Sequence, residues 1–486
     1  MSRGNAKLEV GQLVLTSSTP PGNLGLYAYD QDTIGVVGDL VCIDPKSKAE
    51  SSVVTSTVDP VTGRLEKFQA GDAFSPTKQL WQASRRSTMA IIGDSFAVGA
   101  GSVFTASWSG VYSQSSPAAW MMAMLGARFQ IIFAQGEAGT LPRTWINNGS
   151  LAAALATNPD YLFVTGDGDH GYASLSDFSS AYSEIFAAAN KIGCIPIAHV
   201  IPPNNALSSA QERLNVQVNN EWLVNVAPTL YEVIVINVAG ASLSRASNLF
   251  LPDLTVTDGV HWKCGGAFGA AALMAEELDN VIPRAPIPWL DMYESGTTRT
   301  GTIQSPNMIG SSGSVSVLTT TTGVPDGWAA DAAAGQSGTV NTSPRMDGAT
   351  GNWLDFDVTF TAINKVAHAR AATGKKGTLA AGVDSVEFFA EIKMDETTLQ
   401  VVNFPYFYVK FTGTANSYAA SFNPGNTSSL PLGNTLVKNK YTRGVLTLST
   451  GRVPIPAGTT GFDIYVGMQS AGAGNCKFSV GRVTFI

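Results

Sequence analysis

The feature that most constrains the fold is an alternation of short apolar runs with segments of helix length between about residues 85 and 283. The apolar runs read STMAII, FQIIFA, YLFVTG, CIPIAHVI and YEVIVINV, and the helix-length segments lie near 117–126, 176–192, 208–226 and 266–280. Apolar strands that alternate with helices are typical of a parallel sheet covered on both faces. The sequence therefore predicts an α/β domain over 85–283, with any ligand site beyond the carboxyl ends of the strands.

The chain on either side of this domain has a different pattern. Residues 1–84 contain short strand-like runs separated by turn residues, which indicates a small β-rich module. A Pro-rich linker follows the α/β domain at 284–299. Over 300–486, segments such as WLDFDVTF alternate apolar and polar side chains, as half-buried antiparallel strands do. We expect a C-terminal all-β sandwich of jelly-roll type there.

Composition excludes several classes of protein. A chain of 486 residues is expected to form two to three domains. Its net charge of -7 and its lack of Lys or Arg runs argue against binding to nucleic acid. The most apolar segment, 117–134, is interrupted by Gly126, Arg128 and Gln130, so we expect no membrane insertion. The first residues lack the apolar run of a secretory signal peptide.

The four cysteines favour neither a metal site nor a disulfide framework. Cys42, Cys194, Cys264 and Cys476 are scattered along the chain with no C-x-x-C spacing. We interpret them as mostly buried thiols. No metal and no organic cofactor is expected.

The first apolar run ends in Gly-Asp-Ser at 93–95, a position that can present the hydroxyl of Ser95 at the edge of a sheet. A serine nucleophile needs a base within hydrogen-bond reach, and that base needs an orienting group. His261 lies three residues after Asp258 in a loop before an Ala-rich segment. A loop allows the carboxylate to meet one ring nitrogen while the other faces outward. Ser95, His261 and Asp258 are therefore a candidate catalytic triad.

These two segments, IIGDSFAVG and DGVHW, resemble the SGNH hydrolases, also called the GDSL family. The resemblance covers about 200 residues and implies a flavodoxin-like α/β esterase or deacetylase. It also implies that the backbone N–H groups of Ser95 and Gly139 bind the oxyanion of the tetrahedral intermediate.

The third family block should follow YLFV, where this chain reads TGDGDHG. Gly166 and Asp169 match its outer positions, but Gly168 stands where the family has an asparagine. We therefore expect a rearranged oxyanion hole bordered by the 166–170 loop. Glycine has no Cβ, so the backbone at Gly168 could approach the oxyanion closely.

The remaining histidines and one tryptophan have weaker functional interpretations. His170 is a candidate substrate contact because it follows the third block. Trp262, next to His261, either lines the substrate pocket or simply packs in the core. His199 lies inside an apolar run, which favours a buried strand histidine. His368 lies in the C-terminal module, and we assign it no role.

The order of the modules, with GVPDGW in the C-terminal one, resembles the tail spikes and tail fibres of bacteriophages. This resemblance implies a homotrimeric virion protein that acts at the host cell surface and docks to other tail proteins through its N-terminal module. We expect the substrate to be an O-acetylated bacterial surface polysaccharide, either capsule or O-antigen. Tyr406, Tyr408 and Lys410 share one strand face, where rings could stack on sugars; alternatively, this face packs in an interface.

Two other classes of function stay open. The chain could be a non-catalytic receptor-binding or structural tail protein that retains the fold of an esterase. It could also be a bacterial carbohydrate esterase with no role in a virion. Family resemblance alone does not separate lipids, thioesters and acetylated sugars as substrates.

Overall fold

The computed structural model describes most of the chain after residue 85. Side chains are described for 85–97, 112–166, 173–200, 205, 207, 209–243, 249–256, 259–285, 287, 289, 324, 328–347, 349, 351–371, 382–414, 418–422 and 431–486. For the strands before residue 53, and for 108–111 and 316–317, only the strand assignment is described. Asp258, Gly168, Asp169 and His170 lie outside the described residues.

The chain forms two compact units, Met1–Arg85 and Arg86–Ile486. The first unit contains an antiparallel sheet in the order β1-β2-β5-β6 and the hairpin β3-β4. These strands are β1 (Lys7–Leu8), β2 (Gly11–Leu15), β3 (Gly25–Asp30), β4 (Thr33–Val37), β5 (Leu40–Ile43) and β6 (Glu50–Ser52).

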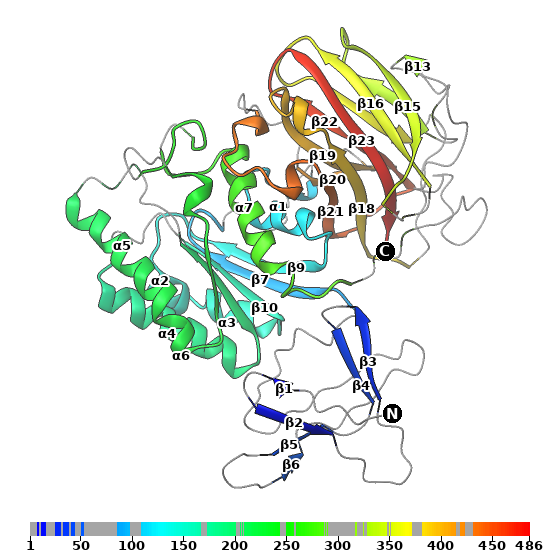
Figure 1. The fold of residues 1–486 in the computed structure, drawn as a ribbon. Helices are drawn as coiled ribbons and strands as arrows, with labels where there is room; N and C mark the ends of the chain where they lie inside the picture. Colours follow the sequence, from blue (N-terminus) through cyan, green and yellow to red (C-terminus); the bar gives the residue numbers. More distant parts are fainter. Residues whose placement is uncertain are drawn as a thin grey trace. The chain divides into compact units, whose positions relative to one another are not determined.

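A parallel five-stranded sheet organises the first part of the second unit, as the alternating pattern predicts (Figure 1). Its strands are β7 (Ser87–Gly93), β9 (Phe129–Gly136), β10 (Tyr161–Thr165), β11 (Ile195–Val200) and β12 (Ile234–Asn237). Their order is β12-β11-β10-β7-β9, which is the flavodoxin-like order 2-1-3-4-5. The strand order reverses between β7 and β10, and ligands of such folds bind at the carboxyl ends of the strands beside that point.

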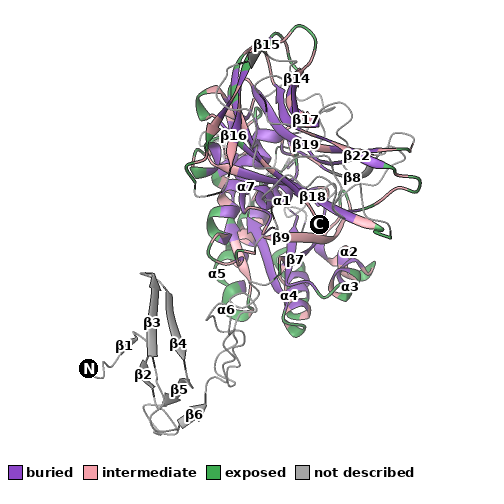
Figure 2. Ribbon diagram, turned by 90° about the vertical axis from the view of Figure 1, so that its right-hand side faces the viewer, coloured by how far each residue is buried: buried purple, intermediate pink, exposed green. Residues whose placement is uncertain are grey.

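Helices cover both faces of this sheet; its central strands β7, β10 and β11 are buried, whereas most of β9 is only partly buried (Figure 2). Met89 and Ile91 point to the face that packs against α1 (Pro117–Met124) and α7 (Cys264–Leu278). Ala90 and Ile92 point to the opposite face. That face packs against α2 (Pro142–Asn147), α3 (Ser150–Ala156), α4 (Leu175–Lys191), α5 (Ala210–Asn225) and α6 (Ala227–Leu230). Because all four strand residues are fully buried, the run has no polar alternation in the sequence.

Local signals determine where several helices begin. Ser116 caps α1 by accepting a hydrogen bond from Ala119 N, and Pro117 occupies the first turn, where a missing N–H costs nothing. Ser209 and Glu212 form a reciprocal capping box at the start of α5. These caps satisfy backbone donors that have no partner inside the helix.

The C-terminal part consists of two six-stranded sheets that are antiparallel except for one pair of strands. The first sheet has the order β13-β15-β16-β23-β18-β21 and contains Ser316–Val317, Ser337–Pro344, Asn352–Phe360, Gly474–Phe485, Ser385–Met394 and Val445–Pro454, respectively. The second has the order β14-β17-β22-β19-β20-β8 and contains Trp328–Ala332, Val366–Ala371, Gly461–Ser470, Val402–Thr412, Tyr418–Ser421 and Trp108–Tyr112. Short 3-10 helices lie at η3 (Ala239–Ala241), η4 (Glu396–Thr398), η5 (Leu432–Asn434) and η6 (Lys440–Thr442).

The two sheets pack face to face through aromatic side chains. The ring of Phe388 lies 4.8 Å from that of Phe462 and 6.2 Å from that of Phe411, between centroids. The alternation that predicted these strands is present: along β16, Phe356 and Val358 are buried while Asp355 and Asp357 are partly exposed. The C-terminal part is therefore a β-sandwich.

The α/β sheet and the sandwich share a continuous apolar core. Strand β8, which precedes α1 in the chain, pairs in parallel with β20 at the edge of the second sandwich sheet. The ring of Trp120 in α1 lies 4.3 Å from that of Phe422, and Arg86 forms a 2.6 Å ion pair with the buried Glu387. The sequence pattern did not predict this union of the two parts.

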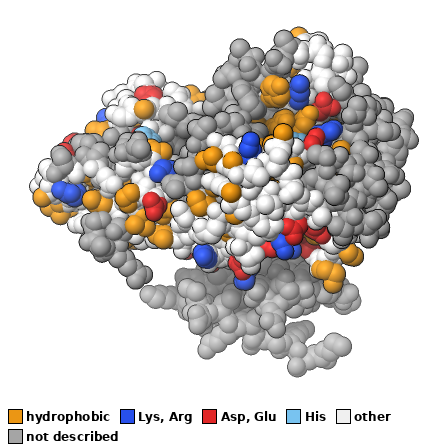
Figure 3. All heavy atoms as spheres, turned by 90° about the horizontal axis from the view of Figure 1, so that it is seen from above, with side chains coloured by type: hydrophobic (Ala, Val, Ile, Leu, Met, Phe, Trp, Pro, Cys, Tyr) orange, Lys and Arg blue, Asp and Glu red, His pale blue; other side chains and the backbone are white. Residues whose placement is uncertain are grey.

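The described part of the face in Figure 3 carries few charged side chains. Figure 3 shows lysines, arginines, aspartates and glutamates scattered among uncharged and hydrophobic side chains on the face in view. Within the described ranges, the structure has no helix that is long and apolar enough to cross a membrane.

Candidate active site

Ser95 lies in a tight turn at the carboxyl end of β7. The buried carboxylate of Asp94 accepts a hydrogen bond from Phe96 N at 2.9 Å, and Ala97 N donates to Asp94 O at 3.1 Å. Asp94 N donates to Thr165 O at the end of the neighbouring strand β10, at 3.2 Å. The turn therefore holds the half-buried Ser95 beside the point where the strand order reverses.

Gly93 makes this turn possible because only glycine fits there. A Cβ atom built on Gly93 would lie 1.7 Å from the carbonyl oxygen of Thr165. Since the obstructing atom belongs to the backbone of the adjacent strand, no side-chain movement could relieve the clash. The glycine before Asp94 thus allows β7 and β10 to approach each other directly below Ser95.

His261 approaches the same turn from a hairpin-like loop. Val256 N donates to His261 O at 2.8 Å, and Gly259, with φ +70°, makes the reversal between them. The imidazole of His261 stacks on the ring of Phe96, with centroids 5.4 Å apart and an interplanar angle of 26°. Because Phe96 directly follows Ser95, the fold brings the two predicted segments into contact, although they are 166 positions apart in the sequence.

The geometry around the triad is only partly described. Between the described side chains of Ser95 and His261 there is no hydrogen bond, and such contacts in unliganded enzymes often tighten only when substrate binds. Asp258 lies outside the described residues, so its predicted role is not tested by the structure.

The loop that carries Gly139 is anchored to the same strand end. Glu137 N donates to Gly93 O at 3.0 Å, directly after β9 ends at Gly136. Gly139 follows in the exposed turn with φ +72°, and no described atom would meet a Cβ there within 4 Å. The first two blocks of the predicted site therefore lie side by side at one edge of the sheet.

Glu137 braces this loop, and sequence reasoning missed it. Its carboxylate accepts hydrogen bonds from Ser150 Oγ at 3.1 Å and from Asn148 Nδ2, while its carbonyl accepts one from Thr140 Oγ1 at 2.7 Å. Trp145 Nε1 donates in turn to Thr140 Oγ1 at 2.9 Å. Trp145 and Ser150 belong to the following helices and Asn148 lies between them, so no local motif signals their role.

The predicted third block begins at the same edge. Thr165, the last residue of β10, pairs with Gly93, so Gly166 lies next to Asp94. A Cβ on Gly166 would lie 2.5 Å from the Trp145 ring and 3.6 Å from Asp94 Oδ2. The described part of the block thus borders the Ser95 turn, whereas Gly168 and His170 lie outside the described residues.

His199 is hydrogen-bonded to the last residue of the neighbouring strand β10. It is 1% exposed in β11, and its Nε2 is hydrogen-bonded to Thr165 Oγ1 at 2.9 Å. Burial lowers the pKa of His199 to about 4, so the ring is neutral at pH 7. Since the carbonyl of Thr165 accepts the Asp94 N–H, a neutral His199 is linked through one residue to the turn that carries Ser95.

This buried histidine gives the protein an acid-sensitive stability. The pKa of His199 is about 4 in the folded chain, against an ordinary value of 6.5. Between these values the unfolded chain binds a proton that the folded chain does not, so stability present above pH 6.5 is lost as the pH falls toward 4. We expect His199 to account for a loss of about 2 to 3 kcal/mol in the free energy of unfolding between pH 7 and 4.5.

Urea denaturation of the parent and of His199→Gln at pH 7 and 4.5 measures this contribution. The variant should lose about 2 to 3 kcal/mol less than the parent over the same interval, because glutamine does not titrate. Equal losses in both proteins would contradict a neutral, buried His199.

The other predicted binding residues are packed within the protein. Trp262 is 1% exposed, and its Nε1 donates to Ser242 Oγ at 3.3 Å, which favours the packing interpretation. Tyr406 is fully buried, with its hydroxyl 2.6 Å from His368 Nδ1. Burial lowers the pKa of His368 to about 4.

Tyr408 is partly exposed and packs mainly against other tyrosines. Its ring stacks with that of Tyr465, at 4.3 Å and 10°, and with that of Tyr406, at 5.9 Å and 22°. Lys410 lies over the ring of Tyr418, at 5.8 Å from its centroid. The strand face that the sequence singles out is therefore occupied by contacts among its own side chains.

Among the described residues, neither a cysteine nor a cluster of metal ligands forms part of this site. Cys194, Cys264 and Cys476 are buried free thiols, and burial raises the pKa of Cys476 to about 12. Among the residues that the structure describes, no group of three or more His, Cys, Asp or Glu side chains could hold a metal ion.

Comparison with known proteins finds similarity at the level of structure. No family model matches the sequence, and no curated protein matches it. One similar solved structure is a protein from Desulfitobacterium hafniense described as a lipolytic protein of the G-D-S-L family. It is 18% identical with a TM-score of 0.31, and the match covers 40% of this chain and 100% of that one.

Two further solved structures are similar over the same share of the chain. An α/β hydrolase from the metagenome of Lake Arreo is 18% identical, with a TM-score of 0.33 and coverage of 41% of this chain and 98% of its own. A catalytic mutant of an acetylxylan esterase from Geobacillus stearothermophilus is 10% identical, with a TM-score of 0.34 and coverage of 42% and 98%. At these identities the comparison concerns the fold, and any assignment of chemistry depends on Ser95 and His261 themselves.

Proposed function

We propose that this protein is a serine esterase of the SGNH type that removes O-acetyl groups from a bacterial surface polysaccharide. The observation that carries the proposal is the contact between the Ser95 turn and His261 at the switch point of a flavodoxin-like sheet. A Ser-His hydrolase needs a serine on a strand-end turn and a histidine close to it. Here the histidine stacks on Phe96, the residue that directly follows the serine.

The proposed reaction proceeds through an acetyl-enzyme. Ser95 Oγ attacks the ester carbonyl while His261 removes its proton, and the carbon becomes tetrahedral. His261 then donates this proton to the departing sugar oxygen as the C–O bond breaks. Water, deprotonated by the same histidine, attacks the acetyl group and releases acetate and Ser95. Asp258 is proposed to orient His261 and to stabilise its protonated form.

The oxyanion of each tetrahedral intermediate is proposed to bind to the backbone N–H groups of Ser95 and Gly139. The anchoring of the Gly139 loop to Gly93 supports this pairing, because it fixes one donor relative to the other. Loss of one such donor typically costs about 2.7 to 4 kcal/mol in transition-state stabilisation. We propose that the backbone near Gly168, rather than an asparagine side chain, completes the hole.

The polysaccharide and virion parts of the proposal depend on the arrangement of modules. We propose a homotrimeric phage tail spike that acts at the host surface and docks to the tail through residues 1–84. The sandwich supports a jelly-roll assignment, because β16-β23-β18-β21 faces β17-β22-β19-β20. Light scattering separates a trimer from a monomer of 50.9 kDa.

Proton NMR of an O-acetylated capsule or O-antigen before and after treatment tests the function. The acetyl methyl signal of the polysaccharide should disappear as free acetate forms, and Ser95→Ala should leave the polysaccharide unchanged. Hydrolysis of an aryl acetate without release of polysaccharide acetate would refute the substrate class. Loss of both activities would favour a non-catalytic tail protein, and absence of the protein from purified particles would favour a free bacterial esterase.

A further inference from the structure

A groove of about 530 Å³, most of whose lining residues are polar or charged, lies on the sandwich, formed by the first of its two sheets together with η4 and the segment after η6. Along β16 the partly exposed Asp355 and Asp357 line the groove, and the buried Phe356 between them also contributes to its lining. Its volume lies within the range of small-molecule binding sites, about 300 to 1,000 Å³.

The floor of the groove consists of two cross-strand rows. Strand pairing places Asn341 opposite Asp355, Asp355 opposite Ser479, and Ser479 opposite Lys393. Adjacent strands lie about 4.8 Å apart, so this row of four side chains spans about 15 Å. The register is fixed by the sheet, and the polar groups are therefore presented at a regular spacing.

A second row of polar side chains runs beside the first. The pairing places Thr339 opposite Asp357 and Asp357 opposite Lys477. Asp395 follows on the same line, since its N–H donates to Lys477 O at 3.2 Å. Glu396 and Arg443 form the wall above these rows.

Several groups in the groove have hydrogen-bonding capacity that the protein does not use. Asn341 Oδ1 is buried and has no hydrogen-bond partner. Across the described ranges, neither the ammonium of Lys393 nor the guanidinium of Arg443 forms an ion pair or a side-chain hydrogen bond. A buried acceptor without a partner is unfavourable, and a ligand donor would satisfy it.

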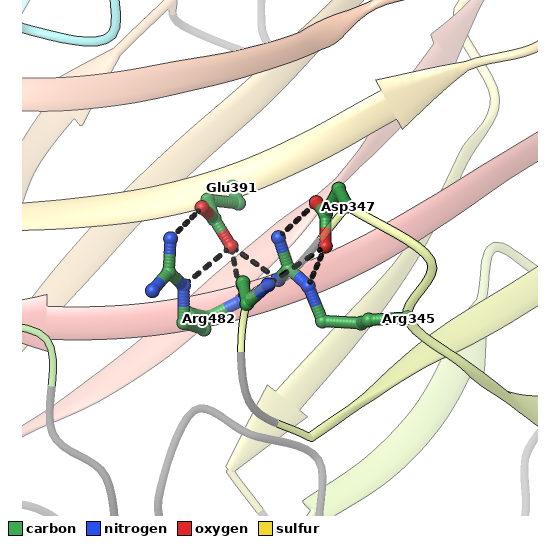
Figure 4. A network of polar contacts seen from close by, with 5 residues as sticks. Arg345, Asp347, Glu391 and Arg482 are labelled. Atoms are coloured by element: carbon green, nitrogen blue, oxygen red, sulfur yellow. Dashed lines mark hydrogen bonds and ion pairs between the residues drawn. The ribbon is translucent and has the colours of Figure 1, made fainter. Parts of the chain in front are cut away.

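Strand β18 also carries a charged cluster whose members are paired with one another. Glu391, two residues before Lys393, accepts from Arg345 at 2.5 Å and from Arg482 at 2.6 Å (Figure 4). Arg345 also pairs with Asp347 at 2.6 Å, so this network is satisfied within the protein. In the groove, Asp357 pairs with Lys477 at 3.5 Å and Asp355 with Ser479 at 2.5 Å, whereas Lys393 and Arg443 have no such partner among the described residues.

The charges of the groove indicate the kind of ligand. Three cationic side chains and four carboxylates nearly cancel, which disfavours a polyanion or a polycation. Donors and acceptors alternate along the rows instead, and a sugar hydroxyl is both a donor and an acceptor. The pairing of Asp355 with Ser479 Oγ, at 2.5 Å, shows that this floor already accommodates a hydroxyl group.

We propose that this groove is a non-catalytic binding site for a short, hydroxyl-rich segment of a surface polysaccharide. The choice of a bacterial polysaccharide as ligand rests on the proposed function, whereas the site itself rests on the groove. Binding here would hold the polymer on the enzyme between successive reactions at Ser95. Asn341, Lys393 and Arg443 would donate or accept the hydrogen bonds that fix the sugar.

An array of bacterial capsular and O-antigen polysaccharides, followed by titration of those that bind, tests this proposal. Full-length Ser95→Ala, which should leave esters intact, is expected to bind at least one of them. Adding Lys393→Gln and Arg443→Gln should weaken that binding at least tenfold, or about 1.4 kcal/mol. Neither cation has an ion pair or side-chain hydrogen bond to lose among the described residues, so thermal unfolding should change little.

A matched control removes two cations outside the groove, Lys191→Gln and Lys365→Gln, and should bind as the Ser95→Ala parent does. Undiminished binding by the groove variant, or no binding to any polysaccharide on the array, would overturn the proposal. Aryl acetate hydrolysis by Lys393→Gln/Arg443→Gln, with Ser95 intact, should stay within twofold of the parent. The hydrolysis assay therefore tests the esterase chemistry, and the binding assay separately tests whether the groove binds polysaccharide.

Discussion

Replacing Ser95 with alanine is expected to lower kcat/KM for an aryl acetate by about 10⁴- to 10⁶-fold, with the fold unchanged. The proposed acetyl-enzyme cannot form without this hydroxyl. His261→Ala should cause a loss of similar size, because a serine without its base is a poor nucleophile at neutral pH. The double variant should be little worse than either single one, since the members of a triad act as a unit.

Initial rates of aryl acetate hydrolysis measure this effect, and thermal unfolding confirms that each variant is folded. Ser176→Ala, on the exposed side of α4, is the matched control and should keep full activity. Asp258→Asn should reduce the rate less than the loss of the serine does. Near-full turnover by Ser95→Ala would show that the hydrolytic serine lies elsewhere.

Removing residues 300–486 is expected to abolish soluble, folded protein, which makes the sandwich a structural part of the esterase. The cut would expose Trp120, which packs on Phe422, and would leave β8 without its partner strand β20. It would also leave Arg86 without Glu387, and an unpaired, largely buried charge is strongly destabilising. The apolar core that spans both parts would be divided.

Removing residues 1–84 is the matched truncation. These residues make up all but the last residue of the separate compact unit Met1–Arg85, so the shortened chain should fold and hydrolyse an aryl acetate at the parent rate. Yield of soluble protein, circular dichroism and esterase rate measure both truncations. A soluble and active fragment that ends at residue 299 would refute the structural role of the sandwich.

The α/β sheet could be predicted from the sequence because its pattern is local. The central strands are almost wholly apolar since both of their faces are covered, and runs such as 161–165 and 195–200 stand out against the more polar segments between them. The union with the sandwich depends on contacts between distant segments, which leave no periodic pattern. One signal was present, however: α1 reads PAAWMMAM, which is apolar all round, and such a helix is covered on more than one side. In the structure every residue of α1 is buried.

The candidate site was predictable where chemistry requires a particular residue type at a particular spacing. The Gly-Asp-Ser turn and the histidine loop meet this condition, and the structure brings Phe96 and His261 together. The supporting residues Glu137 and His199 do not, because their partners Ser150 and Thr165 are determined by the packing of helices and strands. The sequence placed Tyr406 and Tyr408 on one face of β19, where their rings stack on each other. The closer stacking of Tyr408 on Tyr465 could not be predicted, because Tyr465 belongs to another strand.

The most direct test of the central claim is covalent labelling of the nucleophile with a fluorophosphonate, located by peptide mass spectrometry. An activated serine displaces fluoride and forms a stable phosphonyl ester, whereas ordinary serines do not react. We predict one label per chain, on Ser95, and its loss in His261→Ala. Labelling at another residue, or no labelling of the folded protein, would contradict the assignment of Ser95 as the nucleophile.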